Sequence, residues 1–129
     1  MNVRKMLAGA GFITLTLAGA VAHPAVANAG PAVLISPVAW AGNNNYLGCS
    51  IVNAGPTTIT VTMEILEYHG HPLETAVAMI PPGEVRMVDV ISSPGYCKFT
   101  GHFNKSLVRA SLYTYDPLTG GSHVVLPAQ

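Results

Sequence analysis

The chain contains two cysteines, Cys49 and Cys97, which are 48 positions apart. With a single pair, the connectivity of any disulfide is fixed. In the chain-entropy model, closing a loop of this length stabilises the folded state by roughly 4 kcal/mol. That is a large part of the net stability of a small domain. A bond between these two residues would therefore restrict the fold more than any other feature of the sequence.

The N-terminus predicts that this bond forms. Two positive residues, Arg4 and Lys5, precede an apolar run over residues 6–22, which is the layout of a secretory signal peptide. The small residues of Ala27-Asn28-Ala29 predict cleavage before Gly30, with Ala22 and Ala27 as alternative cut points. We therefore expect a secreted or periplasmic protein, exported to an oxidising compartment in which a cysteine pair becomes a disulfide.

The alternative for the apolar run is a permanent transmembrane anchor. The run contains several glycines and barely reaches the roughly 20 residues that a spanning helix needs, so we expect no membrane span after cleavage. The expected organisation is a signal peptide over 1–29 and one domain over 30–129. Removal of Arg4 and Lys5 leaves four basic and six acidic residues, which disfavours nucleic-acid binding.

Alternation with a period of two residues is the dominant pattern of the expected domain. It is clearest over 57–68, where apolar side chains occupy every second position: Ile59, Val61, Met63 and Ile65. The intervening Thr60, Thr62 and Glu64 are polar, as in a strand with one buried face. Similar patterns, separated by Gly, Pro and Asn turns, predict further strands at 32–40, 46–53, 75–80, 85–91, 96–100, 107–115 and 122–126.

Seven or eight strands in about 100 residues predict an all-β fold, a sandwich of two antiparallel sheets. Cys49 and Cys97 each share a strand face with apolar residues, so their sulfurs are expected to meet between the sheets, as in immunoglobulin domains. Two immunoglobulin features are absent, because Trp40 precedes Cys49 and Tyr96 directly precedes Cys97. The prediction is therefore an immunoglobulin-like or fibronectin-type-III-like sandwich.

Five segments carry a resemblance to known proteins: 47–53 around Cys49, Pro82-Gly83, 96–100 around Cys97, 109–112 and the C-terminal 126–129. Together they resemble a loosely defined group of small secreted bacterial proteins without assigned function. The resemblance implies a compact exported domain, and it transfers no catalytic residue and no cofactor.

Two imidazoles flank a glycine in His69-Gly70-His71, on a predicted turn. Imidazole binds copper and zinc, so a metal site is one hypothesis for this turn, with His102, His123 or Met63 as further ligands. No fixed spacing links these residues. The alternative is a solvated hairpin tip.

A second candidate site is an aromatic surface. Tyr113 and Tyr115 are two residues apart and should project from the same sheet face, with Arg109 beside them and Tyr96 and Lys98 as further candidates. Tyrosine and arginine are common at recognition surfaces, which favours a protein or carbohydrate partner. The alternative is that these tyrosines only cover the sheet.

Catalytic motifs are weak. Ser122 and His123 are neighbours, but successive strand side chains point to opposite faces, so they cannot form a nucleophile and base pair. The leading hypothesis is thus an exported, non-enzymatic binding or structural module without a cofactor. The alternatives are a periplasmic copper or zinc protein that uses His69 and His71, and a small secreted hydrolase with an unrecognised site.

Overall fold

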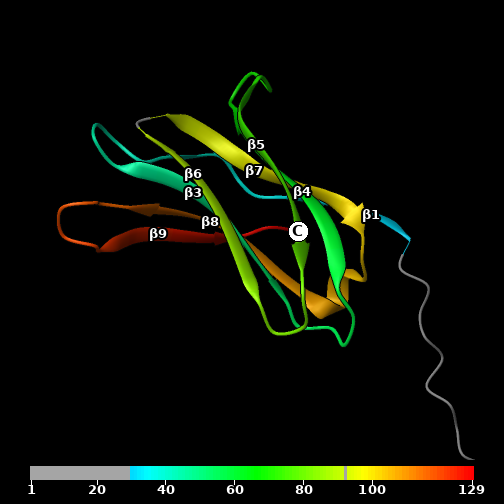
Figure 1. Ribbon diagram of the computed structural model, residues 1–129. Helices are drawn as coiled ribbons and strands as arrows, with labels where there is room; N and C mark the ends of the chain where they lie inside the picture. The colour runs from blue at the N-terminus through cyan, green and yellow to red at the C-terminus, as the bar shows by residue number, and fades with distance from the viewer. Residues whose placement is uncertain (1–29, 92) are drawn as a thin grey trace, which may run out of the picture.

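The computed structural model describes residues 30–91 and 93–129, so the expected signal peptide lies outside it. These residues form two antiparallel sheets packed face to face (Figure 1). The first sheet has the spatial order β1 (Pro31–Ile35), β7 (Pro94–His102), β4 (Ile59–Glu67) and β5 (Pro72–Ile80), and the short β2 (Ala39–Trp40) also pairs with β7. The second sheet has the order β6 (Val85–Ile91), β3 (Tyr46–Asn53), β8 (Val108–Tyr115) and β9 (Ser122–Pro127). The predicted all-β sandwich is confirmed.

Strands with one buried face agree closely with the predicted ranges. Along β4, the apolar positions are buried and the alternate Thr and Glu positions are partly or fully exposed. The predicted strand over 32–40 is divided into β1 and β2 around Pro37, and β1 lies at the edge of its sheet, as the proline indicated. A 3₁₀ turn, η1 (Lys105–Leu107), precedes β8 and is the one helical element among the described residues.

Two strands are longer than predicted. Strand β5 begins at Pro72, and its first four residues are exposed, so the edge of the sheet shows no burial pattern there. Strand β7 begins at Pro94 and includes Gly95, which lies before the predicted range of 96–100. A Cβ atom on Gly95 would lie 2.6 Å from the backbone oxygen of Leu66, so the glycine permits close pairing with β4 at this point.

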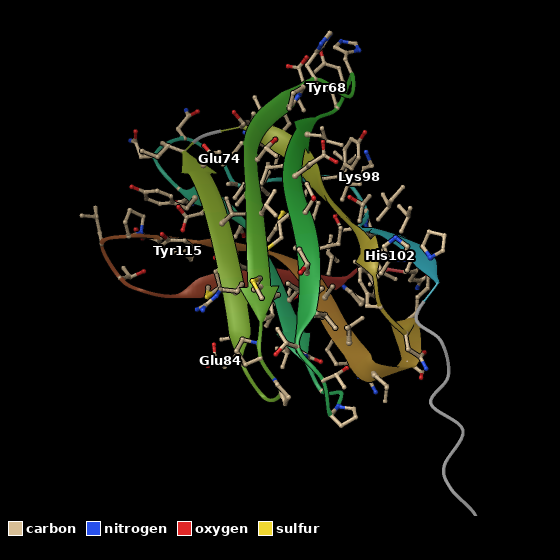
Figure 2. All side chains as sticks on the ribbon, turned by 45° about the vertical axis from the view of Figure 1, so that its right-hand side comes forward. Tyr68, Glu74, Glu84, Lys98, His102 and Tyr115 are labelled. Atoms are coloured by element: carbon tan, nitrogen blue, oxygen red, sulfur yellow. A yellow bond between two sulfur atoms is a disulfide. The ribbon has the colours of Figure 1, made fainter. Side chains whose placement is uncertain are left out.

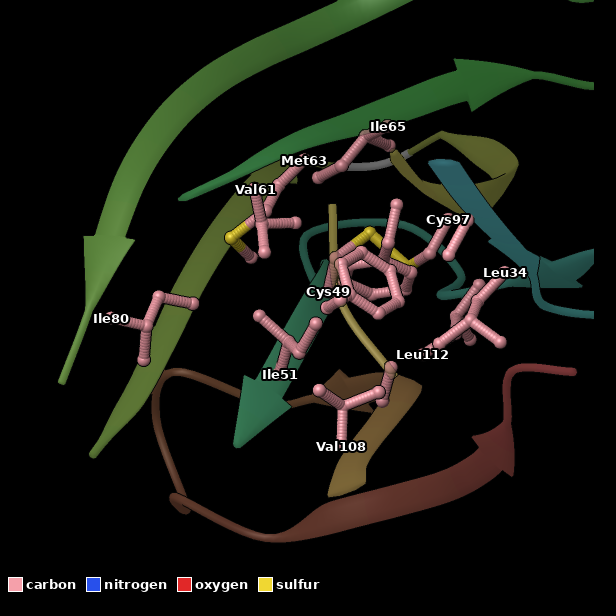
Figure 3. Packing of buried hydrophobic residues seen from close by; sticks show 14 of the residues in the cluster. Leu34, Cys49, Ile51, Val61, Met63, Ile65, Ile80, Cys97, Val108 and Leu112 are labelled. Carbon is pink, nitrogen blue, oxygen red and sulfur yellow. A yellow bond between two sulfur atoms is a disulfide. The ribbon is translucent and has the colours of Figure 1, made fainter. Parts of the chain in front are cut away.

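The disulfide joins the two sheets at the centre of the core. Cys49 on β3 and Cys97 on β7 form an S–S bond of 2.01 Å with a Cα–Cα distance of 5.7 Å. Both residues are fully buried, and Figure 3 shows the bond surrounded by aliphatic side chains from both sheets. The predicted inter-sheet bridge is confirmed.

The positions of the first and last strands distinguish this sandwich from the immunoglobulin constant domain. In that domain the first strand pairs with the strand of the first cysteine, and the last strand with that of the second cysteine. Here β1 pairs instead with β7, which carries Cys97. The last strand, β9, pairs with β8, which lies between it and β3, the strand of Cys49. The shared architecture is thus the two-sheet sandwich with its bridge, and the strand order differs at both ends.

Backbone hydrogen bonds connect the two sheets along one side of the sandwich. The backbones of Ile35 and Gln129 exchange two hydrogen bonds of 2.9 and 3.1 Å, which connect β1 to the segment after β9. Strands β5 and β6 form the edges on the opposite side. In the stretch from residue 30 onward that the structure describes, no helix has the length and apolar character needed to cross a bilayer.

Candidate functional site

Three tyrosines and a carboxylate gather on the outer face of the second sheet. Tyr46 on β3 is directly opposite Tyr115 on β8. In the next outward-facing row, Gly48 on β3 lies between Asp89 on β6 and Tyr113 on β8. We call Tyr46, Asp89, Tyr113 and Tyr115 the tyrosine cluster. Three neighbouring strands therefore supply one site.

Gly48 makes room for the Tyr113 ring. A Cβ atom at position 48 would lie only 2.2 Å from Cζ of Tyr113 and 2.5 Å from its hydroxyl oxygen. The ring therefore lies directly over the glycine, and Tyr113 is only 7% exposed although it is on the outer face of the sheet. Any larger residue at position 48 would displace the ring.

Tyr115 connects the remaining members of the cluster to this ring. Tyr46 and Tyr115 stack with their centroids 4.9 Å apart and an interplanar angle of 12°. Tyr115 also stacks on Tyr113 at 5.9 Å and 29°. The Tyr115 hydroxyl donates to Oδ2 of Asp89 at 3.3 Å, and Figure 2 shows Tyr115 at the surface of the second sheet. Cross-strand aromatic contacts of this kind hold side chains on a sheet surface in fixed positions.

A shallow depression of about 380 Å³ opens beside the cluster. Ser50 and Ser111, from the adjacent strands β3 and β8, contribute hydroxyls that are 2.8 Å apart. We call this feature the tyrosine depression, and its lining residues are Ser50, Met87, Asp89, Ser111, Tyr113, Tyr115, Gly120 and Val125. The lining combines hydroxyl groups and one carboxylate with short apolar patches.

The hydroxyl group of Tyr113 is buried and makes no hydrogen bond within the described part of the protein. Burial raises the pKa of Tyr113 to about 12, and the negative charge of Asp89 and the neighbouring Tyr115 contribute to the shift. Burial, Asp89 and Tyr46 also raise the pKa of Tyr115. Natural proteins leave few buried polar groups unpaired, so the Tyr113 hydroxyl requires an explanation.

Replacement of Tyr113 by phenylalanine is expected to stabilise the protein by about 1 kcal/mol at neutral pH, because it removes an unpaired buried hydroxyl. The pH dependence should also change. A folded-state pKa of about 12 against an ordinary value of 10.0 means that native stability falls as pH rises from about 10 to about 12, as the unfolded chain loses this proton first. Tyr113→Phe should lack this component.

Urea unfolding across this alkaline range checks both effects, with Tyr68→Phe as the control because Tyr68 is exposed at a hairpin tip. If Tyr113→Phe is less stable than the native protein at neutral pH, the hydroxyl is paired and the interpretation is wrong.

The structure separates the residues that the sequence analysis grouped as one surface. Tyr113 and Tyr115 do share a face, as their spacing predicted. Arg109 is on the same strand, but it lies roughly 13 Å along β8 from Tyr113. Its Nη1 donates to the backbone oxygens of Ser106 and Val108, at 3.0 and 2.8 Å.

The placement of Tyr96 and Lys98 on this surface is wrong. Both residues alternate with the buried Cys97 and Phe99 on β7, so they face outward from the first sheet, on the opposite side of the sandwich. Lys98 forms an ion pair with Glu64 of β4 there, at 2.9 Å.

The histidine turn is an exposed hairpin tip between β4 and β5. His69 lies against Tyr68 with ring centroids 3.8 Å apart, and Nε2 of His71 is 4.0 Å from Glu67. Figure 2 shows Tyr68 at this tip, far from His102. No group of three or more His, Cys, Asp or Glu side chains suited to a metal ion occurs within the described ranges.

Two of the further ligands suggested for this turn are wrong. His102 is at the other end of β7, roughly 23 Å along the strand from Gly95, which pairs with Glu67 beside the turn. Met63 is 1% exposed, inside the core. The side chain of His123 is outside the described part of the chain, so its suggested role stays a prediction, as does the separation of Ser122 from His123.

Sequence reasoning missed Asp89, Tyr46 and Gly48. Alternation with Cys49 places Tyr46 and Gly48 on the outer face of β3, which is a usable signal. Nothing local indicates that β6 and β8 flank β3, and only that pairing brings Asp89 to the tyrosines.

Comparison with known proteins identifies a shared fold. No family model and no curated protein matches the chain. Among solved structures, the chain is similar to one described as "Crystal Structure of Thermotoga maritima 1070", with 13% sequence identity and a TM-score of 0.53. The match covers 75% of this chain and 91% of that chain. At this identity the likeness concerns the fold alone. It places the protein among two-sheet antiparallel β-sandwiches.

Proposed function

We propose that this protein is an exported, non-enzymatic binding module whose ligand docks in the tyrosine depression on the outer face of the second sheet. The partner would be met in the cell envelope or outside the cell. Export is supported by the signal-peptide pattern of residues 1–29 and by the disulfide between Cys49 and Cys97, a bond typical of oxidising compartments.

The observation that carries the proposal is the buried Tyr113 hydroxyl. An unpaired buried hydroxyl costs about 1–3 kcal/mol, and a phenylalanine would avoid that cost. The arrangement also requires glycine at position 48, which is unfavourable within a strand. Local features that lower stability without a compensating contact are expected at functional sites.

The chemistry of the lining supports binding. The volume of about 380 Å³ lies within the range of small-ligand pockets. The two serine hydroxyls lie within hydrogen-bond distance of each other, and within the described part of the chain the lining contains no histidine or lysine that would act as a base for them. Tyrosine is prominent among the residues that dominate binding energy at interfaces. All but one of the lining residues lie on paired strands, which gives the site a rigid frame.

Site-specific photocrosslinking in cells that export the protein tests the proposal. Met87 lines the depression and is 58% exposed, so p-benzoylphenylalanine at this position should give a discrete adduct on irradiation. Val77 on β5 is the matched control, because it is 70% exposed and lies on the other sheet. We expect an adduct at position 87 and none at position 77.

A second variant separates site-specific capture from a chance encounter. Tyr115→Ala removes the exposed part of the ring stack, and it should reduce the adduct at position 87 several-fold while the amount of exported protein is unchanged. Equal adducts at both positions, or none at position 87, would show that this face binds nothing and that the proposed function is wrong.

A further inference from the structure

The tyrosine depression carries one negative charge, that of Asp89. Among the side chains that the structure describes, its lining contains no lysine, arginine or histidine. The three ion pairs found in the described ranges use Glu64, Glu67 and Glu84, and none involves Asp89. Within the described residues, Oδ2 of Asp89 accepts a hydrogen bond from the neutral Tyr115 hydroxyl, at 3.3 Å. A cationic group at this position would gain an ion pair without displacing one.

Two aromatic rings, those of Tyr113 and Tyr115, lie beside this carboxylate in the lining of the depression. Tyr115 lies between Tyr46 and Tyr113 in a continuous stack, and Tyr46 and Tyr115 are only partly buried. The electron-rich faces of aromatic rings attract ammonium and guanidinium groups. Two tyrosines beside one carboxylate, with Tyr46 stacked behind Tyr115, therefore favour a positive charge over a neutral polar group.

The two other charge classes of ligand fit less well. A phosphate, sulfate or carboxylate would approach Asp89 with no cationic residue among the described lining side chains to offset the repulsion. A neutral sugar would donate hydrogen bonds to Asp89, but it would leave the negative charge in place. Burial is the main cause of the raised pKa of Tyr113, and the negative charge of Asp89 adds to that shift.

We propose that the tyrosine depression binds an organic cation, an ammonium or guanidinium group, with Asp89 as its counter-ion and the rings of Tyr113 and Tyr115, which line it, as its cation–π partners. This inference rests on the proposed function, because it names the ligand class of the same site. An arginine or lysine side chain of a peptide and a small organic amine share this chemistry.

The test is an NMR titration of the protein purified after export of the full chain. The probes are N-acetyl-L-arginine amide, N-acetyl-L-lysine amide and tetramethylammonium, and N-acetyl-L-citrulline amide is the uncharged match for the arginine derivative. We expect at least one cationic probe to shift the ring signals of Tyr46 and Tyr115 saturably, and citrulline to bind about tenfold more weakly or not at all. High salt should weaken the binding.

Asp89→Asn tests the counter-ion directly. It keeps the shape of an exposed side chain, and it should lower affinity for the cationic probe about tenfold. Glu74→Gln is the matched control, an exposed acid on β5 of the other sheet, and it should bind as the native protein does. Tyr115→Phe retains the ring and removes the hydrogen bond to Asp89, so it should retain most of the affinity.

Three outcomes would overturn the inference: equal binding of citrulline and arginine derivatives, a neutral sugar such as N-acetylglucosamine binding more tightly than any cation, or no probe shifting the ring signals. The photocrosslinking adduct at position 87 distinguishes failure of the proposed ligand class from failure of the proposed binding function. If that adduct forms while the cations fail, the ligand class is wrong and the binding face stands. If both fail, the proposed function is wrong as well.

Discussion

Replacing Cys49 and Cys97 together by alanine is expected to lower the free energy of unfolding by roughly 4 kcal/mol. The bond joins residues with a sequence separation of 48, so its loss mainly increases the conformational entropy of the unfolded chain. The alanines also leave space at the centre of the core, because both cysteines are fully buried there between the sheets (Figure 3). For a domain of this size, the loss approaches the whole stability.

Denaturant unfolding of the native and double-alanine proteins measures this effect, and the slope should increase for the variant because its unfolded chain is less compact. The native protein unfolded with and without a reducing agent is the control, since its sequence is the same in both and no side chain is truncated. A loss of less than about 1 kcal/mol in both comparisons would contradict the loop-closure argument.

The strands that could be predicted from the sequence are those with one buried and one exposed face. Strands β3, β4 and β8 alternate, and the predicted ranges match the observed ones within two residues. Strand β5 is different because its N-terminal half is exposed on both faces at the edge of the first sheet, so no period appears in Leu73-Glu74-Thr75. Alternation of apolar and polar residues indicates a strand with one buried face, and it gives no signal where neither face is buried.

The candidate site could likewise be predicted only where local pattern determines it. Spacing along β8 correctly placed Tyr113 and Tyr115 together, because two residues on one strand share a face. The assignment of Tyr96 to that surface failed because it required knowing which sheet contains β7. Asp89 was missed for the same reason. Pairing between distant strands depends on the whole chain, and a single sequence shows only local pattern.

A buried polar residue at the end of β3 had no local signal at all. Asn53 is 0% exposed, and its Nδ2 donates to the backbone oxygens of Thr57 at 2.7 Å and Ile80 at 2.8 Å. Its Oδ1 accepts from the backbone nitrogen of Gly55 at 2.9 Å. Its own backbone exchanges hydrogen bonds with Gly83 and Glu84. The Asn53 side chain thus connects the β3–β4 turn to the end of β5. Strands β3 and β5 belong to different sheets.

Asn53→Ala is expected to lower the free energy of unfolding by about 3 kcal/mol, because it leaves three backbone groups without their partners, one of them in a fully buried bond. Asn45→Ala is the matched control. Asn45 makes one such bond, to the backbone oxygen of Ala41 at 2.9 Å, and lies partly exposed in a turn, so its loss should cost about 1 kcal/mol or less.

Asn53→Asp separates the hydrogen bonds from the volume of the side chain. The two sizes match, but an ionised carboxylate would face the oxygens of Thr57 and Ile80, which should raise its folded-state pKa above the ordinary value of about 3.9. The deficit should therefore be largest at neutral pH and shrink towards about pH 4, where the protonated acid donates one bond. Urea unfolding at neutral pH and at about pH 4 measures this deficit in the free energy of unfolding. An equal deficit at the two pH values would mean that solvent reaches the carboxylate and that the Asn53 side chain is not buried.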